Sequence, residues 1–287
     1  MKFSVFSVSM PEYDIYETVR ILKELGYDGV EWRAATPAPA EKPADYNFDV
    51  RYWQYNLSNI DITKIEEKAG EVKRICDEAG LEIPSITTYL KLWDNEDIER
   101  ALKAAGIMNC RNIRVLAPVY DEKENYRTLF NRSVLQVRVL EKLAQKYNVR
   151  ISFEIHMGNI IPSASAAYRL VAGTDPNSIG IIFDPGNMVY EGFENYRLGI
   201  ELLGEYLAIV HVKNGVWKKI DTSEDGVEIW KPSWVPYKKG IVDFKNLIRI
   251  LKDINYTGYM SIEDFSNEED TYSKLKGNIQ YLKQLVL

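Results

Sequence analysis

The 287-residue sequence has few cysteines and few histidines, the residue types that build disulfide frameworks and thiolate or multi-histidine metal sites. Its two cysteines, Cys76 and Cys110, form no CxxC pair, so we expect buried or semi-buried thiols in a reducing, cytoplasmic setting. The two histidines are His156 and His211. Because there are so few histidines, the position of each one is informative.

The sequence also lacks long apolar runs and an excess of basic residues. No stretch approaches the roughly 18 uninterrupted apolar residues of a membrane span, and Pro11 and Glu12 come before any signal-length apolar core. The net charge of −6 comes from 42 acidic and 36 basic residues and gives no reason to expect a nucleic acid or an anionic membrane as partner. With 46% hydrophobic and 27% charged residues, the composition is typical of a soluble globular protein.

What the chain does contain is a regular alternation of short apolar runs with longer segments of helical period. The runs predict strands at 3–8, 28–32, 82–87, 112–116, 150–155, 179–183, 207–212 and 258–262. The periodic segments predict helices at 13–25, 62–79, 96–105, 126–147, 163–171, 197–203, 243–254 and 272–285. Eight strand–helix units favour parallel strands with crossover helices, and no GxGxxG turn follows the first strand. We therefore predict an α/β fold, a (β/α)8 TIM barrel, with one domain over residues 1–287.

Two segments are too long for plain connections between a strand and a helix. Residues 34–60 are rich in Pro and Ala and then in aromatics, including Phe48. Residues 214–240 carry Trp217, Trp230 and Trp234. We expect both to be insertions over the active face. The second is either a lid that excludes water or a surface hairpin or subunit contact, which leaves a homo-oligomer open.

The ends of the last four predicted strands each carry a side chain that can bind a metal ion: Glu154, Asp184, His211 and Glu263. In a barrel, the carboxyl ends of the strands form the active face. Each residue has another reading by itself, because Asp-Pro-Gly makes a turn and a histidine between two valines suits a core. Their coincidence favours one divalent-metal site. Three carboxylates and one imidazole suit Mn²⁺, Mg²⁺ or Co²⁺, with Zn²⁺ as an alternative.

Further candidates lie on or beside the same strand ends. His156 follows Glu154 by two residues and points to the same side if the strand continues, which favours contact with substrate over a surface-loop histidine. Lys213 is either a ligand for a carboxylate, phosphate or hydroxyl group or a solvated lysine. Glu31 and Trp32 end the second strand as a hydroxyl acceptor and a stacking wall, although Trp32 also suits helix packing.

Five sequence motifs carry a resemblance to a known family. They are GYDGVEW at 26–32, FEIH at 153–156, FDPGN at 183–187, VHVKN at 210–214 and the segment 240–263, which begins GIVDF and ends GYMSIE. Together they resemble the xylose-isomerase-like barrels of the sugar phosphate isomerase/epimerase superfamily. The resemblance implies that Glu154, Asp184, His211 and Glu263 are the metal ligands. It also implies that Glu154 and Glu263 are the acid/base pair on the two faces of the substrate.

The chain departs from the pattern of several sugar epimerases at three positions. Asn187 stands where they have a histidine, Trp217 where an arginine is common, and Asn214 where an aspartate is frequent. These differences leave the metal site intact and concern the choice of substrate. Asn187 is therefore among the substrate-binding candidates.

The function implied is that of a metal-dependent isomerase or epimerase, most simply a manganese enzyme, acting on a small sugar or polyol ketone through an enediolate. An inosose-type dehydratase would use the same metal and carboxylates to expel water. An endonuclease-IV-like DNA repair enzyme needs a trinuclear zinc site rich in histidines, which two histidines cannot build. A non-catalytic sugar-binding barrel is disfavoured because both acid/base candidates are present.

Overall fold

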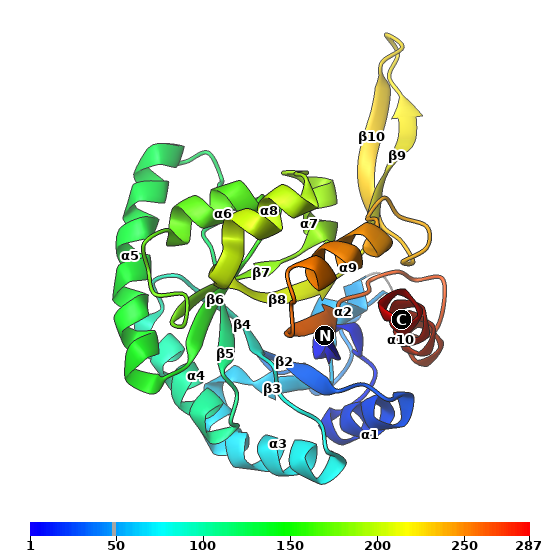
Figure 1. Ribbon diagram of the computed structural model, residues 1–287. Coiled ribbons are helices and arrows are strands. Elements are labelled where there is room, and N and C mark those ends of the chain that lie inside the picture. The colour runs from blue at the N-terminus through cyan, green and yellow to red at the C-terminus, as the bar shows by residue number, and fades with distance from the viewer. Residues whose placement is uncertain (48–49) are drawn as a thin grey trace.

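The strands of the protein close into a parallel barrel in the computed structural model, which describes residues 1–47 and 50–287 (Figure 1). The eight barrel strands of these residues are β1 (Lys2–Phe6), β2 (Gly29–Ala35), β4 (Ile86–Lys91), β5 (Asn112–Leu116), β6 (Arg150–Glu154), β7 (Ile179–Phe183), β8 (Leu207–Val212) and β11 (Tyr259–Ile262). β1 pairs with both β11 and β2, which closes the sheet. The predicted TIM barrel is confirmed.

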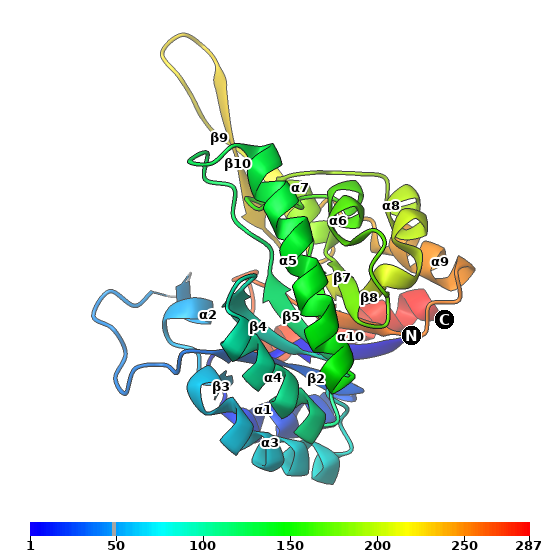
Figure 2. The ribbon, with the colours of Figure 1, turned by 90° about the vertical axis from the view of Figure 1, so that its left-hand side faces the viewer.

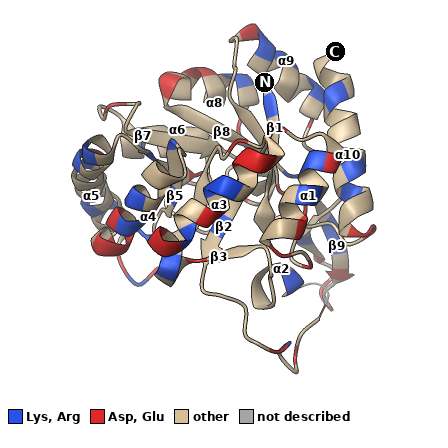
Figure 3. Cartoon of the chain, turned by 90° about the horizontal axis from the view of Figure 1, so that it is seen from below, with Lys and Arg blue, Asp and Glu red and all other residues tan. Residues whose placement is uncertain are grey.

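Helices surround the barrel and connect one strand to the next (Figures 1 and 2). They are α1 (Ile15–Leu25), α3 (Ile65–Ala79), α4 (Asn95–Ile107), α5 (Tyr126–Tyr147), α6 (Ala164–Val171), α7 (Pro185–Tyr190), α8 (Tyr196–Leu203), α9 (Phe244–Asp253) and α10 (Thr271–Val286). Local sequence sets their ends: α1 begins in a capping box of Asp14 and Glu17 and ends at Gly26 in the left-handed conformation. Lys, Arg, Asp and Glu recur along these outer helices (Figure 3).

The core is built from strands that are covered on both sides. Every residue of β2 and of β7 is buried, because one face lines the barrel interior and the other packs against helices. This double burial explains why the strand sequences are apolar without strict alternation. The helices contribute one apolar face each, as α9 does with Phe244, Leu247 and Leu251.

The bounds of several strands and helices differ from expectation by a few residues, and two differences have a clear physical reason. The third barrel strand begins at Ile86 rather than residue 82, although the backbone of Glu82 already accepts a hydrogen bond from Val30. Pro84 has no N–H to donate and interrupts this ladder. The short helix α7 was not predicted. It begins immediately after β7 because Asp184 caps it and Pro185 occupies its first position.

The two long segments form structure of their own. The segment 34–60 contains α2 (Arg51–Gln54) and the first two residues of β3 (Asn59–Asp61), a strand that pairs with β2. Phe48 and Asp49 lie outside the described residues. Residues 214–240 contain an antiparallel hairpin of β9 (Gly215–Thr222) and β10 (Glu228–Trp234), which projects from the barrel (Figures 1 and 2). None of the helices in the described part of the chain is long and apolar enough to cross a membrane.

Candidate metal centre and active-site cleft

Four metal-capable side chains meet at the carboxyl ends of neighbouring strands. Glu154 ends β6, Asp184 follows β7, His211 lies near the end of β8, and Glu263 follows β11. All four are buried, and one donor atom from each lies within 4.8 Å of the others. Donors on opposite sides of one ion are separated by about twice the bond length, roughly 4.0–4.8 Å. The four residues predicted as ligands are thus brought together with a spacing and chemistry that fit one divalent ion.

The ring of His211 is held between carboxylates on its two edges. Its Nδ1 lies 3.1 Å from Glu154 Oε1 and 3.6 Å from Asp184 Oδ2, so this nitrogen faces the cluster. Its Nε2 lies 3.2 Å from Glu31 Oε1, and Glu31 also accepts a hydrogen bond from the Thr87 hydroxyl. Such a carboxylate orients the imidazole and fixes which nitrogen carries the proton. Glu31, expected at the substrate, is instead completely buried behind His211.

Asp184 both forms a turn, as Asp-Pro-Gly suggested, and contributes to the metal-capable cluster. Oδ1 accepts a hydrogen bond of 2.8 Å from the backbone N–H of Asn187 and so caps α7. Oδ2 lies 2.9 Å from the ammonium of Lys213 and turns toward the cluster. One oxygen therefore begins the helix while the other remains available to the site.

Basic residues only partly balance the buried carboxylates. Arg114 donates from Nη1 to Glu154 Oε2, and Lys213 contacts both Asp184 and Glu263. The buried group contains two permanently charged basic side chains, Arg114 and Lys213, and four carboxylates, those of Glu31, Glu154, Asp184 and Glu263. The neighbouring charges of Glu31 and Glu154 raise the pKa of His211 well above its usual value although burial lowers it, so without an ion the imidazole is protonated and the group carries a formal charge of −1. A bound metal ion requires the neutral imidazole, and the four carboxylates and two cations then leave a formal charge of −2, which a divalent cation would compensate.

The two glutamates of the cluster have different proton affinities. Burial alone would raise the pKa of Glu154, but the neighbouring charges of Arg114 and His211 hold that pKa well below its usual range. Burial raises the pKa of Glu263 to about 7, opposed by the ammonium of Lys213 and reinforced by the charge of Glu154. The environment thus separates the pKa values of two chemically identical side chains.

A cleft of about 370 Å³ opens above this cluster. Its polar lining includes Arg114, Glu154, His156, Asn187, Lys213 and Glu263. Its aromatic lining comes from four separate segments: Trp53 of α2, Tyr89 of β4, Trp234 of β10 and Phe265 after β11. Its size and mixture of aromatic and convergent polar side chains suit a small polar ligand.

Of the remaining candidate residues, some line this cleft and one does not. His156 is half-buried, lines the cleft and places Nδ1 2.7 Å from the Met157 carbonyl. Asn187 lines the cleft and donates from Nδ2 to Glu154 Oε1 at 3.1 Å. Trp32 is not at the cleft: it is fully buried in the core on the opposite face of β2 from Glu31. Adjacent strand residues point to opposite faces, so Glu31 and Trp32 could not both face a ligand.

Arg114, Tyr89 and Phe265 were not identified from the sequence, and Trp53 and Trp234 were placed only within insertions expected over the active face. A signal for Arg114 was present, because it is a charged residue in the middle of the apolar run 112–116 and has to be paired if it is buried. Tyr89 lies beyond the predicted end of its strand, and Trp53 lies in an insertion. No local pattern indicated that Tyr89 would face the cleft, or which of the aromatic residues in the insertion would do so.

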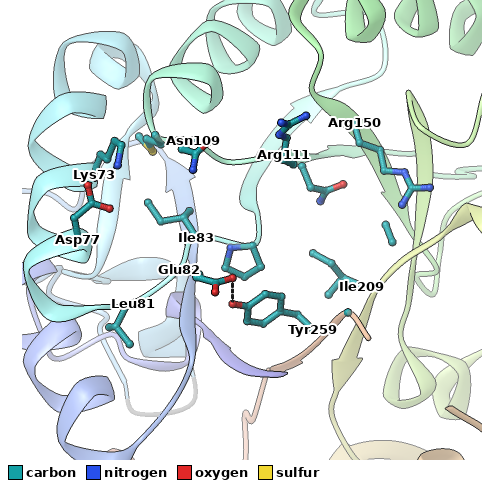
Figure 4. A pocket seen from close by; sticks show the side chains of 15 residues that line it. Lys73, Asp77, Leu81, Glu82, Ile83, Asn109, Arg111, Arg150, Ile209 and Tyr259 are labelled. Atoms are coloured by element: carbon teal, nitrogen blue, oxygen red, sulfur yellow. Dashed lines mark hydrogen bonds and ion pairs between the residues drawn. The ribbon is translucent and has the colours of Figure 1, made fainter. Parts of the chain in front are cut away.

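A separate cavity of about 430 Å³ lies at the opposite end of the barrel, lined by residues near the strand starts that include Arg111, Arg150 and Tyr259 (Figure 4). Glu82 in this cavity accepts a hydrogen bond of 2.7 Å from the Tyr259 hydroxyl. The metal-capable cluster lies at the other end, where barrel enzymes carry their catalytic residues.

Comparison with known proteins supports the same assignment of the fold. Residues 19–285 match the family model described as xylose isomerase-like TIM barrel. Among curated proteins, an inosose dehydratase of Clostridium perfringens is 26% identical over 159 residues, which cover 51% of each chain. The match thus spans about half the length of that relative.

Solved structures match almost the whole chain at low sequence identity. The 3-keto-D-glucoside 4-epimerase YcjR of E. coli superposes with a TM-score of 0.72 at 20% identity and covers 99% of each chain. A xylose isomerase-like TIM barrel protein of Mycobacterium smegmatis in complex with magnesium gives a TM-score of 0.69 at 16% identity, covering 99% of this chain and 96% of that one. At these identities, the likeness establishes the fold.

Proposed function

This chain belongs to the xylose isomerase-like TIM barrel family, and we therefore propose that it is a divalent-metal-dependent isomerase or epimerase of a small sugar or related polyol ketone. The observation that carries the proposal is the buried group of Glu154, Asp184, His211 and Glu263 below a polar cleft. We place the enzyme in the cytoplasm as one domain, with 34–60 and 214–240 as insertions and with no nucleic acid or membrane as partner. Its two cysteines are free thiols.

We propose that Glu154, Asp184, His211 and Glu263 hold the ion. Mn²⁺ is the first choice because the donors are three carboxylates and one imidazole, and Mg²⁺, Co²⁺ and Zn²⁺ are alternatives. An ion bound there would act as a Lewis acid on the carbonyl of a substrate and would acidify the proton on the α-carbon. Glu31 keeps Nε2 of His211 engaged, which leaves Nδ1 facing the three carboxylates.

Glu154 and Glu263 are proposed to move the proton. They approach the cleft from β6 and from the end of β11, so a ligand between them would face one carboxylate on each side. In an epimerase, one takes the proton from carbon and the other returns a proton to the opposite face. In an isomerase, the proton returns to the neighbouring carbon. Asn187, His156 and Lys213 are proposed to bind the hydroxyl and carbonyl oxygens.

A dehydratase is the second candidate, and one observation favours it. The curated relative from Clostridium perfringens that matches half of this chain is an inosose dehydratase. The same carboxylates would remove a proton from the carbon next to a carbonyl and then assist the departure of a hydroxyl group as water. The two reactions share their first step and differ in what leaves.

Proton NMR in deuterated water, with Mn²⁺-loaded protein and a panel of ketoses and inososes, separates the candidates. Solvent deuterium at carbon without loss of water is the result expected for an isomerase or epimerase. Loss of water would identify a dehydratase. No change in any substrate of the panel would favour a barrel that binds sugars without reaction.

A further inference from the structure

Beside the cleft lies a second compartment, which the proposed function does not use. It has a volume of about 500 Å³ and is lined by residues of β2, of the segment after it and of α2, among them Arg33, Thr36 and Gln54. Trp53 and Tyr89 line both the cleft and this compartment. The two spaces therefore adjoin across these rings.

Arg33 is the unusual residue of the compartment. Three arginines of the described residues are almost completely buried, and two of them have a carboxylate partner: Arg51 pairs with Glu12 and Arg114 with Glu154. Arg33 is 6% exposed, makes no ion pair within residues 1–47 and 50–287, and has a buried Nε without a hydrogen-bond partner. Its guanidinium lies 5.1 Å from the centre of the Tyr89 ring.

A buried cation without a counterion is costly, so its persistence calls for an explanation. The nearest acidic residue along the strand, Glu31, already interacts with His211 and Thr87. Among residues 1–47 and 50–287, no Asp or Glu lines the compartment. The amide oxygen of Gln54 is likewise buried and accepts no hydrogen bond from the part of the chain that the structure describes. A cation and an acceptor are thus both left for a ligand.

We propose that Arg33 binds an oxyanion of the substrate, a carboxylate or a phosphate, at the end remote from the metal-capable cluster; this inference rests on the proposed function. Arg33 follows Glu31 by two residues on β2, which places its backbone roughly 6.6 Å farther toward the active face. The guanidinium of Arg114, which donates to Glu154, lies 4.9 Å from the centre of the same Tyr89 ring, so the two guanidinium groups are at most about 10 Å apart. A five- or six-carbon ketose with a charged end group can span that distance. Its carbonyl end would lie at Glu154 and Glu263, and its charged end would lie at Arg33, with Gln54 accepting from a hydroxyl group.

The planar guanidinium supports an oxyanion over a neutral group. Arginine presents two parallel N–H donors that match the geometry of a carboxylate or phosphate. Hydrogen bonds to a charged group are stronger than neutral ones, enough for about tenfold to hundredfold in affinity. A neutral sugar would leave the charge of Arg33 uncompensated.

The test uses three ketoses that differ only at carbon six: D-fructose, D-fructose 6-phosphate and D-fructuronate. Isothermal titration calorimetry of the metal-loaded protein should give at least about tenfold tighter binding of one or both anions than of D-fructose. The stronger of the two identifies phosphate or carboxylate as the source. In Arg33→Gln, the ratio of anion to neutral affinity should fall to near one, and Arg33→Lys should retain part of it.

Arg111→Gln is the matched control. Arg111 is exposed, has no ion pair within the described part of the chain and lines the cavity at the opposite end of the barrel (Figure 4). The Arg111→Gln variant should bind the anionic ketoses in preference to D-fructose as strongly as the unmodified protein does. A preference that is lost in Arg111→Gln but kept in Arg33→Gln would overturn the proposal and place the anion at that other cavity.

Other results would also overturn it. The proposal would be overturned if the unmodified protein bound the three ketoses with equal affinity. It would also be overturned if the protein bound none of them measurably. A merely structural Arg33 would instead lower the Tm in Arg33→Gln and in Arg33→Met while the preference persisted. Deuterium incorporation, measured separately, reports on the proposed function: anion preference without incorporation refutes that function alone, whereas incorporation without preference refutes the role of Arg33 alone.

Discussion

At the scale of single residues, the chemistry of the site depends on which edge of His211 faces the carboxylates. Nδ1 lies within 4 Å of Glu154, Asp184 and Glu263, whereas Nε2 lies against Glu31. The imidazole therefore connects one carboxylate that orients it to a cluster that can bind metal. The imidazole of His211 also stacks on the ring of Phe6, with 5.9 Å between the ring centroids, and this contact limits the rotation of the imidazole.

Replacing His211 should remove most of the bound metal. His211→Ala deletes the single imidazole donor of the cluster and frees Glu31 from its contact, so metal affinity should fall at least about tenfold to hundredfold. Elemental analysis after dialysis against a limiting concentration of Mn²⁺ measures the effect. His156→Ala is the control, because His156 lines the cleft outside the cluster and this variant should retain the metal. Equal metal content in His211→Ala and the unmodified protein would contradict the assignment of His211 as a ligand.

Replacing either proposed base should separate metal binding from turnover. Glu154→Gln and Glu263→Gln keep the size and one oxygen donor but lose the proton acceptor. We expect each variant to fold, to bind metal at least weakly, and to lose about 10²-fold or more in turnover. One of them could still exchange solvent deuterium on one face of a substrate, measured by NMR. Near-normal turnover with metal retained would show that the residue is not a base, whereas the exposed Glu67→Gln should behave like the unmodified protein.

At the scale of secondary-structure elements, the six-residue helix α7 links the fold to the site. Its first turn packs so tightly on the residues after β8 that a Cβ on Gly186 would lie 2.7 Å from the carbonyl oxygen of Lys213 and 2.8 Å from its Cβ. The absence of a side chain at Gly186 thus allows Lys213 to reach Asp184 and Glu263.

Two glycine-to-alanine variants test this packing with opposite expected signs. Gly186→Ala should destabilise the protein by about 1–3 kcal/mol through overpacking and should lower turnover by displacing Lys213. Gly106→Ala in α4 should stabilise the protein by up to about 1 kcal/mol, because the new Cβ has no atom of the described residues within 4 Å apart from its chain neighbours and the backbone of its own helix. Unfolding in urea, followed by circular dichroism, measures both. A neutral or stabilising Gly186→Ala would show that α7 adjusts without cost to Lys213.

At the scale of the whole molecule, the hairpin of β9 and β10 is the feature that departs most from a plain barrel. Its base contributes Trp234 to the cleft, where the ring stacks on Tyr190 at 4.0 Å. Its outer part extends away from the barrel and exposes Ile220, Val227 and Trp230 (Figure 2). Exposed aromatic and aliphatic side chains on a projecting element are typical of subunit contacts.

We expect the hairpin to act as a subunit contact, with its base adjoining the cleft. Amide hydrogen exchange of residues 216–233 should then slow as the protein concentration rises, and Trp230→Asp should abolish that dependence. A lid would instead show slower exchange when substrate binds, at every protein concentration. Uniformly fast exchange under all these conditions would mark the hairpin as a plain surface excursion.

The barrel and the approximate place of the cluster could be predicted from the sequence, because both follow from the order and period of its apolar segments. Apolar runs and helical periods recur along the chain, and the ends of consecutive parallel strands must meet at one edge. Glu154, Asp184, His211 and Glu263 could therefore be grouped without knowledge of any contact.

Features that depend on side-chain direction, or on contacts between segments distant in sequence, could not be predicted and became visible in the folded chain. The strand pleat turns Glu31 toward His211 inside the barrel and Trp32 toward the core between the barrel and its helices. A shift of the strand register by one residue would exchange the directions of these two side chains, and the sequence does not fix the register that closely. Arg33 and Tyr89 come from different strands, and their shared compartment exists because the barrel places those strands side by side. A pattern along one strand contains no information on which partners close a pocket, because that depends on packing between strands and inserted segments.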